Sequence, residues 1–203
     1  MALAVDAPPG SYLLDATVDA LAETLGLRDG ATGAHCDRTV ELAGSIGRRL
    51  GLGDGSLREL GYAARVHDIG KVGVPDAVLR KPGPLNPLEA GLMRKHSEWG
   101  ADLVRRIPGL ERVAVIVRHH HERFDGHGYP DRLVGADTPL ESGILAVADA
   151  YVAMTDDRPY RRALSTERVA RELRAGRATQ FDPDVVDALE RELRGHSTAL
   201  IHA

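Results

Sequence analysis

The sequence predicts a single all-α domain, and three observations support this prediction. Most of the 203 residues follow the roughly 3.6-residue period of helices, and few stretches alternate as strands do. Hydrophobic residues make up 43% and charged residues 28% of the chain, which is typical of a globular domain. No internal repeat or interdomain linker interrupts the pattern. We therefore expect the chain to fold around one core.

The expected helices each carry apolar residues along one face. In chain order they run from Ser11 to Leu27, through Val40 to Leu50, from Ser56 toward His67, from Asn86 past His96, from Leu110 to Glu122, from Leu140 to Thr155, from Ser165 to Gly176, and from Asp182 through Leu193. Two loops rich in glycine and proline, 72–85 and 124–139, lie between them. Loops of that length in a compact domain are more often functional than idle.

Polar residues mark where several of these helices begin. The pair Ser56 and Glu59 has the spacing of a capping box. Asn86 is followed by a proline at the first helical position, which is a common start signal. Ser165 and Asp182 are expected to cap the last two helices.

Composition excludes several classes of protein. The net charge is −4 and the pI is about 6.1, whereas a dedicated nucleic-acid binder usually has a basic excess. A single cysteine allows no intrachain disulfide. No apolar run approaches the roughly 20 residues that span a bilayer, and the N-terminus lacks the basic start of a signal peptide. We therefore expect a cytoplasmic protein without nucleic-acid or membrane partners.

Candidate metal ligands recur at helix ends and on helix faces. They are His35, His67, Asp68, His96, His120, His121 and Asp149. Imidazole nitrogen and carboxylate oxygen together suit Mn, Fe, Ni or Zn, and helical bundles commonly assemble metal sites from facing helices. Two ions roughly 3.5–4 Å apart can hold a bridging hydroxide and clamp the oxygens of a phosphoester. A bridging role suits Asp68, because a carboxylate has two oxygens.

Some of these histidines and carboxylates have simpler explanations. His96 could be a core or surface histidine, and Asp149 could form a cap or a salt bridge. Successive helical residues diverge by about 100°, so His119, His120 and His121 cannot all face one site. We expect His119 to lie outside the metal set and His127 to be solvated.

Seven segments of the sequence resemble the HD-GYP family, a branch of the HD phosphohydrolase superfamily. They are H-D-I-G-K (67–71), V-P-D-A-V-L-R-K-P-G (74–83), R-K-H (94–96), H-H-E-R-F-D-G-H-G-Y-P (120–130), A-D-A-Y-V-A-M-T (148–155), D-R-P-Y-R (157–161) and T-Q-F-D-P (179–183). The resemblance extends from about Leu21 to Leu193. It implies an HD-domain-type helical bundle in which 21–195 form the catalytic domain, 1–20 an N-terminal segment and 196–203 a tail.

The resemblance also implies a function and a set of roles. The usual activity of the family is hydrolysis of cyclic di-GMP to linear pGpG and often on to GMP, with two divalent ions, most often Fe or Mn. One ion would be held by His35, His67, Asp68 and Asp149, and the other by Asp68, His96, His120 and His121, with Asp68 bridging. Lys71 would contact the scissile phosphate. Arg158 and Arg161 would hold the second phosphate or a guanine, and Gly128, Tyr129 and Pro130 would form the pocket rim.

The sequence departs from the family pattern around the pocket. The departures are Ala31, where a Glu would support a third metal, Ala34 before the first ligand, Arg132 where Gly is usual, Gly143 where Arg is common and Val152 where many members have Asp. None removes an expected ligand, so two ions are expected. The choice of cyclic dinucleotide is left open.

Three functions therefore compete. The first is hydrolysis of cyclic di-GMP, and the second is hydrolysis of another cyclic dinucleotide or nucleotide. The third is a non-catalytic module that binds the messenger or a partner such as a cyclase or receptor. The helix at 11–27 could also serve in a homodimer.

Overall fold

The computed structural model describes residues 9–29, 33–156 and 162–199, and within these ranges the fold is all-α, as predicted. The α-helices are α1 (Pro9–Asp29), α2 (Gly33–Arg49), α3 (Asp54–Val66), α4 (Asp76–Leu79), α5 (Pro87–Val104), α6 (Glu111–His119), α7 (Leu140–Thr155), α8 (Thr166–Ala175) and α9 (Pro183–Ala199). Two 3-10 helices are η1 (Ile69–Gly73) and η2 (Gly135–Asp137). The described residues contain no strand beyond two isolated β-bridges.

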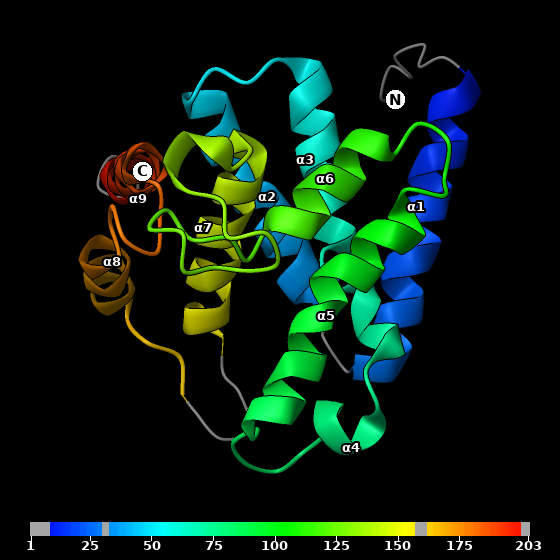
Figure 1. The fold of residues 1–203 in the computed structure, drawn as a ribbon. Coiled ribbons are helices and arrows are strands. Elements are labelled where there is room, and N and C mark those ends of the chain that lie inside the picture. The colour runs from blue at the N-terminus through cyan, green and yellow to red at the C-terminus, as the bar shows by residue number, and fades with distance from the viewer. Residues whose placement is uncertain (1–8, 30–32, 157–161, 200–203) are drawn as a thin grey trace.

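Helices α2, α3, α6 and α7 form the centre of the bundle. Helix α2 packs against α3 and α7, while α5 packs against α6 and η1. Helix α1 lies along one edge, and α8 and α9 lie at the opposite edge (Figure 1). The core is aliphatic, with Ile46, Leu60, Ile116 and Ile144 fully buried. Burying each such side chain stabilises the fold by roughly 1.5–3 kcal/mol.

The helix starts agree with the sequence in three of four cases. Asn86 forms a complete capping box with Glu89, and the Ser165 hydroxyl accepts a hydrogen bond from the Arg168 N–H. The Asp182 carboxylate likewise accepts from the N–H of Asp184 at 2.8 Å. The expected capping box at Ser56 is wrong. The N-cap of α3 is Gly53, three residues earlier, because its extended backbone closes the first turn through its carbonyl, which places Ser56 inside the helix.

The end of α6 also differs from the expectation. The sequence predicts a helix to Glu122, whereas α6 ends at His119. The Glu122 N–H bonds to the carbonyl of His119, three residues back, so the chain tightens into a turn. His120 and His121 therefore leave the helix together. Helix α7, by contrast, spans the predicted range.

A close approach between η1 and α5 depends on Gly70. A Cβ at this position would lie 1.9 Å from the carbonyl oxygen of His96 and 2.5 Å from the N of Gly100. Only glycine allows two backbones to come this close. The glycine of H-D-I-G-K thus brings Asp68 beside His96. Within the described ranges, no helix combines the length and apolar character needed to cross a bilayer.

Candidate metal centre

The seven candidate ligands come from five helices or helix ends, and the fold brings them to one place. They are His35 on α2, His67 and Asp68 between α3 and η1, His96 on α5, His120 and His121 just after α6, and Asp149 on α7. The ligand atoms of His35, His67 and Asp149 lie within 4.8 Å of one another, and so do those of His96, His120 and His121. We call these sets the first triad and the second triad.

Asp68 lies between the two triads. Its Oδ2 is 3.4 Å from Nε2 of His67, in the first triad. Its Oδ1 is 3.4 Å from Nε2 of His96, in the second triad. One carboxylate therefore presents one oxygen to each triad, which is the disposition that a bridging ligand requires.

Three histidines are oriented by their own backbone. The Nδ1 atoms of His67, His96 and His120 lie 2.9, 2.8 and 2.6 Å from carbonyl oxygens three residues back, those of Ala64, Met93 and Val117. A carbonyl only accepts, so each Nδ1 carries the proton and each Nε2 has a free lone pair. Such contacts fix the tautomer and the ring orientation of metal-binding histidines.

The resulting lone pairs need a cation. Nε2 of His67 is buried and has no hydrogen-bond partner among the described residues. Nε2 of His96 lies 3.4 Å from that of His120 and 3.2 Å from that of His121. Acceptors that face acceptors in a buried site are unfavourable unless a positive ion lies between them. The donor set of nitrogen and oxygen atoms fits divalent transition-metal ions.

Burial keeps the second triad neutral. It lowers the pKa of His121 to about 3 and lowers the pKa of His120 well below its usual value, and it also lowers the pKa of His96. Neutral imidazole is the form that binds metal. For Asp68, burial raises the pKa, but His67 and Lys71 outweigh it, so the pKa falls well below the usual value. The second triad therefore offers neutral nitrogens beside the ionised carboxylate of Asp68.

His35 lies between two carboxylates, and Asp156 orients its ring from the side away from Asp149. Nε2 of His35 is 3.2 Å from Oδ1 of Asp149, and its Nδ1 is 3.0 Å from Oδ2 of Asp156. Asp156 also pairs with Arg38. The sequence did not single out Asp156, although it directly precedes the D-R-P-Y-R segment. Its place resembles the carboxylate–histidine–metal arrangement of many metal sites.

Lys71 lies against the bridging position. Its Nζ donates to Oδ2 of Asp68 at 2.7 Å, and its side chain is partly exposed. The contact with a scissile phosphate stays a prediction. Arg158, Arg161 and Ala31 lie outside the described residues. His127 is 83% exposed, so its expected solvation is confirmed.

The G-Y-P loop contacts the second triad directly. The Tyr129 ring stacks on the His121 ring with centroids 4.9 Å apart, and the Tyr129 N–H donates to the carbonyl of His121. Pro130 follows across a cis peptide bond. Gly128 packs on the chain before it, where a Cβ would lie 2.5 Å from Cα of Glu122. The loop is therefore built directly against His121, and its role as the rim of the pocket stays a prediction.

Glu122 anchors this loop, and the sequence did not single it out. Its buried carboxylate accepts hydrogen bonds from the N–H groups of Asp131, Arg132 and Leu133 at 2.7, 3.0 and 3.2 Å. The only signal in the sequence is its position directly after His121. Such a buried carboxylate is stable because charge-assisted hydrogen bonds compensate its lost hydration.

His119 and Arg118 make a second set of contacts with the G-Y-P loop, through Asp131. It belongs to neither triad, as expected, and its Nε2 lies 2.9 Å from Oδ2 of Asp131. Hydrogen bonds from Arg118 lower the pKa of Asp131 to about 2, and His119 adds to this effect. The residues on both sides of the His120–His121 pair therefore hold the G-Y-P loop.

Comparison with known proteins identifies the family. The HD domain family matches residues 6–185 of this chain. The chain belongs to the HD domain family. The predicted HD-GYP membership is confirmed, because cyclic di-GMP phosphodiesterases are among its relatives at about 40% identity.

Two relatives illustrate this similarity. The cyclic di-GMP phosphodiesterase response regulator RpfG of Xanthomonas campestris pv. campestris is 41% identical over 177 residues, which cover 86% of this chain and 47% of that protein. The 3'3'-cGAMP-specific phosphodiesterase 2 of Vibrio cholerae is 36% identical over 171 residues, covering 83% of this chain and 33% of that protein. The chain thus spans less than half the length of these relatives.

Solved structures confirm the fold. The V. cholerae phosphodiesterase V-cGAP3 superposes with a TM-score of 0.68 at 20% identity, covering 88% of this chain and 48% of that one. The HD domain of Listeria monocytogenes PgpH, in complex with cyclic-di-AMP, gives 0.55 at 17% identity, covering 86% and 96%. At these identities the likeness concerns the HD-type fold alone.

Proposed function

We propose that the chain is a metal-dependent phosphodiesterase that hydrolyses cyclic di-GMP to linear pGpG, with GMP as the product of any second hydrolysis. The observation that carries this proposal is the pair of triads with Asp68 between them. Relatives at 41% and 39% identity are cyclic di-GMP phosphodiesterases, which supports this choice of substrate.

Each triad would hold one divalent ion, with Asp68 shared. His35, His67 and Asp149 would hold the first ion, and His96, His120 and His121 the second. Fe or Mn is the proposed metal, because this mixture of imidazole and carboxylate suits both. When bound, such ions supply a nucleophile at neutral pH and stabilise the charge that develops on a phosphoester.

The residues of the chain bind and orient the substrate in this proposal. Three of the four ligands of the second ion are uncharged, so the ion keeps most of its positive charge and attracts a phosphodiester. Lys71 would contact the scissile phosphate as a point charge, turning from Asp68 toward it. Arg158 and Arg161 would hold the rest of the ligand. Tyr129, stacked on His121, would fix that ligand's position.

Two alternatives remain distinct from this proposal. V. cholerae relatives specific for 3'3'-cGAMP favour a mixed cyclic dinucleotide as the substrate. A non-catalytic module that binds the messenger or a cyclase or receptor partner is the other alternative. We also propose residues 21–195 as the catalytic domain, although α1 continues across residue 21, and a homodimer is a further proposal.

Product analysis tests the proposed function. Protein loaded with Fe or Mn without oxygen is incubated with cyclic di-GMP or 3'3'-cGAMP, and the products are separated by chromatography. Elemental analysis of the same sample should give two ions per chain. His67→Ala should abolish turnover, whereas the matched control His127→Ala should retain it, because His127 is solvated. Absence of turnover on cyclic di-GMP with two bound ions would overturn the proposal.

A further inference from the structure

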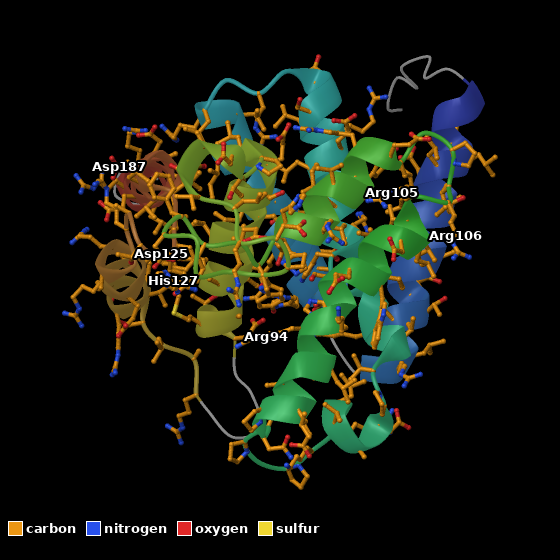
Figure 2. All side chains as sticks on the ribbon, in the orientation of Figure 1. Arg94, Arg105, Arg106, Asp125, His127 and Asp187 are labelled. Atoms are coloured by element: carbon orange, nitrogen blue, oxygen red, sulfur yellow. The ribbon has the colours of Figure 1, made fainter. Side chains whose placement is uncertain are left out.

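Arg94 is an exposed cation at the edge of the candidate centre. It lies on α5, two residues before His96, and its Cζ is 5.4 Å from the centroid of the Tyr129 ring. Among the described residues, no carboxylate pairs with its guanidinium. Its neighbour Lys95, in contrast, pairs with Glu98 at 2.7 Å. In Figure 2, Arg94 lies on the side of α5 that faces α7.

Tyr129 connects Arg94 to the second triad. The same ring that Arg94 covers stacks on His121, with centroids 4.9 Å apart. The guanidinium of Arg94 and the imidazole of His121 therefore contact the same ring, which places Arg94 beside the second triad.

A cyclic dinucleotide carries two phosphodiester charges. In the proposed function, the scissile phosphate lies at the metal centre with Lys71. The other phosphate needs a cation of its own wherever it leaves bulk water. A guanidinium that stacks on an aromatic ring keeps its N–H edge free, and that edge can bind phosphate oxygens in a bidentate manner.

We propose that Arg94 binds the non-scissile phosphate of the cyclic dinucleotide and so selects substrates with two phosphodiesters. This inference rests on the proposed function. It assigns the second phosphate to Arg94 and leaves a guanine to Arg158 and Arg161. Tyr129 is the positioning residue, because its ring holds the guanidinium over the G-Y-P loop.

The test compares substrates with one and with two phosphodiesters. Arg94→Ala, Arg94→Lys and the control Arg106→Ala are assayed with cyclic di-GMP and with bis(4-nitrophenyl) phosphate, which reports on the metal centre alone. Arg106 suits the control because it is another exposed arginine, just beyond the opposite end of α5 (Figure 2). Metal content is measured for every variant.

Arg94→Ala should raise KM for cyclic di-GMP about tenfold, equivalent to about 1.4 kcal/mol, with kcat nearly unchanged. Kinetics with bis(4-nitrophenyl) phosphate and the metal content should stay at the wild-type values. Arg94→Lys should recover part of the lost affinity, because lysine restores the positive charge but not the bidentate geometry of the guanidinium. An equal loss on both substrates, or no change on either, would overturn the assignment.

Equilibrium binding separates this inference from the proposed function. Binding of labelled cyclic di-GMP is measured by dialysis with wild-type protein and with Arg94→Ala. If the wild type binds but does not hydrolyse the messenger, the proposed function fails. The Arg94 assignment then stands if Arg94→Ala binds about tenfold more weakly. It falls if both proteins bind equally or if the wild type does not bind.

Discussion

Gly70 lies so close to His96 that a Cβ on the glycine would be 1.9 Å from the histidine's carbonyl oxygen. This contact joins the segment that carries Asp68 to the helix that carries His96. The spacing between the bridging carboxylate and the second triad therefore depends on a residue without a side chain.

Gly70→Ala should destabilise the fold by about 2 kcal/mol or more, because the added methyl meets the rigid backbone of α5 at His96 and Gly100. Urea unfolding measures this change. Gly61→Ala on α3 is the matched control, since a Cβ there meets nothing within 4 Å. The control should stabilise the helix by about 0.5–1 kcal/mol. Equal effects of the two substitutions would show that the close approach is unimportant.

Glu122→Gln should reduce the metal content from two ions toward one. The amide cannot accept all three hydrogen bonds from residues 131–133, so the loop that holds Tyr129 on His121 is weakened. Among the described residues, the loop stacks on and hydrogen-bonds to His121 of the second triad, so the first ion should remain. Elemental analysis checks the ratio. Glu141→Gln, at another buried glutamate, should keep both ions, and a similar loss there would argue against a specific role of Glu122.

Asp156→Asn should weaken binding of the first ion, in contrast to Glu122→Gln, which should weaken binding of the second. The carboxylate orients His35, and losing such a partner typically costs about 10–100-fold in metal affinity. The first ion should therefore be lost to a chelator at lower concentrations, while the second ion is unaffected. Stepwise chelator titration measures both affinities. The exposed Asp102 on α5 provides the control Asp102→Asn. Equal weakening of both ions would contradict this role.

Arg132→Gly should stabilise the protein by about 1 kcal/mol. Arg132 has φ 57°, in the left-handed region where residues other than glycine are strained. Its backbone N–H can still donate to Glu122 after the change. Thermal unfolding measures the gain. Ala178→Gly, at φ 60°, should act in the same direction. If both variants were less stable than the wild type, the positive φ at these positions would not be a source of strain.

Glu89→Gln should destabilise the start of α5 in a pH-dependent way. A hydrogen bond from Lys81 and then one from the Asn86 N–H lower the pKa of Glu89 below 4.5. A carboxylate whose folded-state pKa is lowered stabilises the fold above its unfolded pKa, and this contribution disappears as pH falls through the folded value.

Thermal unfolding from neutral pH to well below 4.5 checks the sign. The wild type should exceed Glu89→Gln in Tm at neutral pH, and the difference should vanish in acid. In a Lys81→Met background the difference should be smaller. A gap that grows on acidification would contradict the assignment.

The sequence predicted the all-α fold and the seven clustered residues because both depend on local pattern. Helical period identified α7 to the residue, and the paired letters of H-D and H-H marked the cluster. Contacts between distant residues were harder to predict. His35 and Asp156 are 121 residues apart, and nothing in the spacing links them.

The misplaced helix boundaries at Ser56 and Glu122 have a similar cause. Ser56 has the right neighbours for a cap, but the extended backbone of Gly53 starts α3 earlier. The end of α6 depends on the turn at His119 and on Glu122. The N–H groups that donate to the Glu122 carboxylate are nine to eleven residues further along the chain. Local propensity could not weigh these contacts.

The backbone anchors of His67, His96 and His120 have a consequence for folding. Each ring is oriented by a carbonyl only three residues away, so its direction is set as soon as its own turn forms. The rings then lose little further freedom when the helices assemble. What remains to be fixed is the distance between helices, and the aliphatic core determines that distance. Ile116 is a fully buried core residue and cannot bind a metal. A substitution there would therefore change the distance between the two triads by changing how the helices pack.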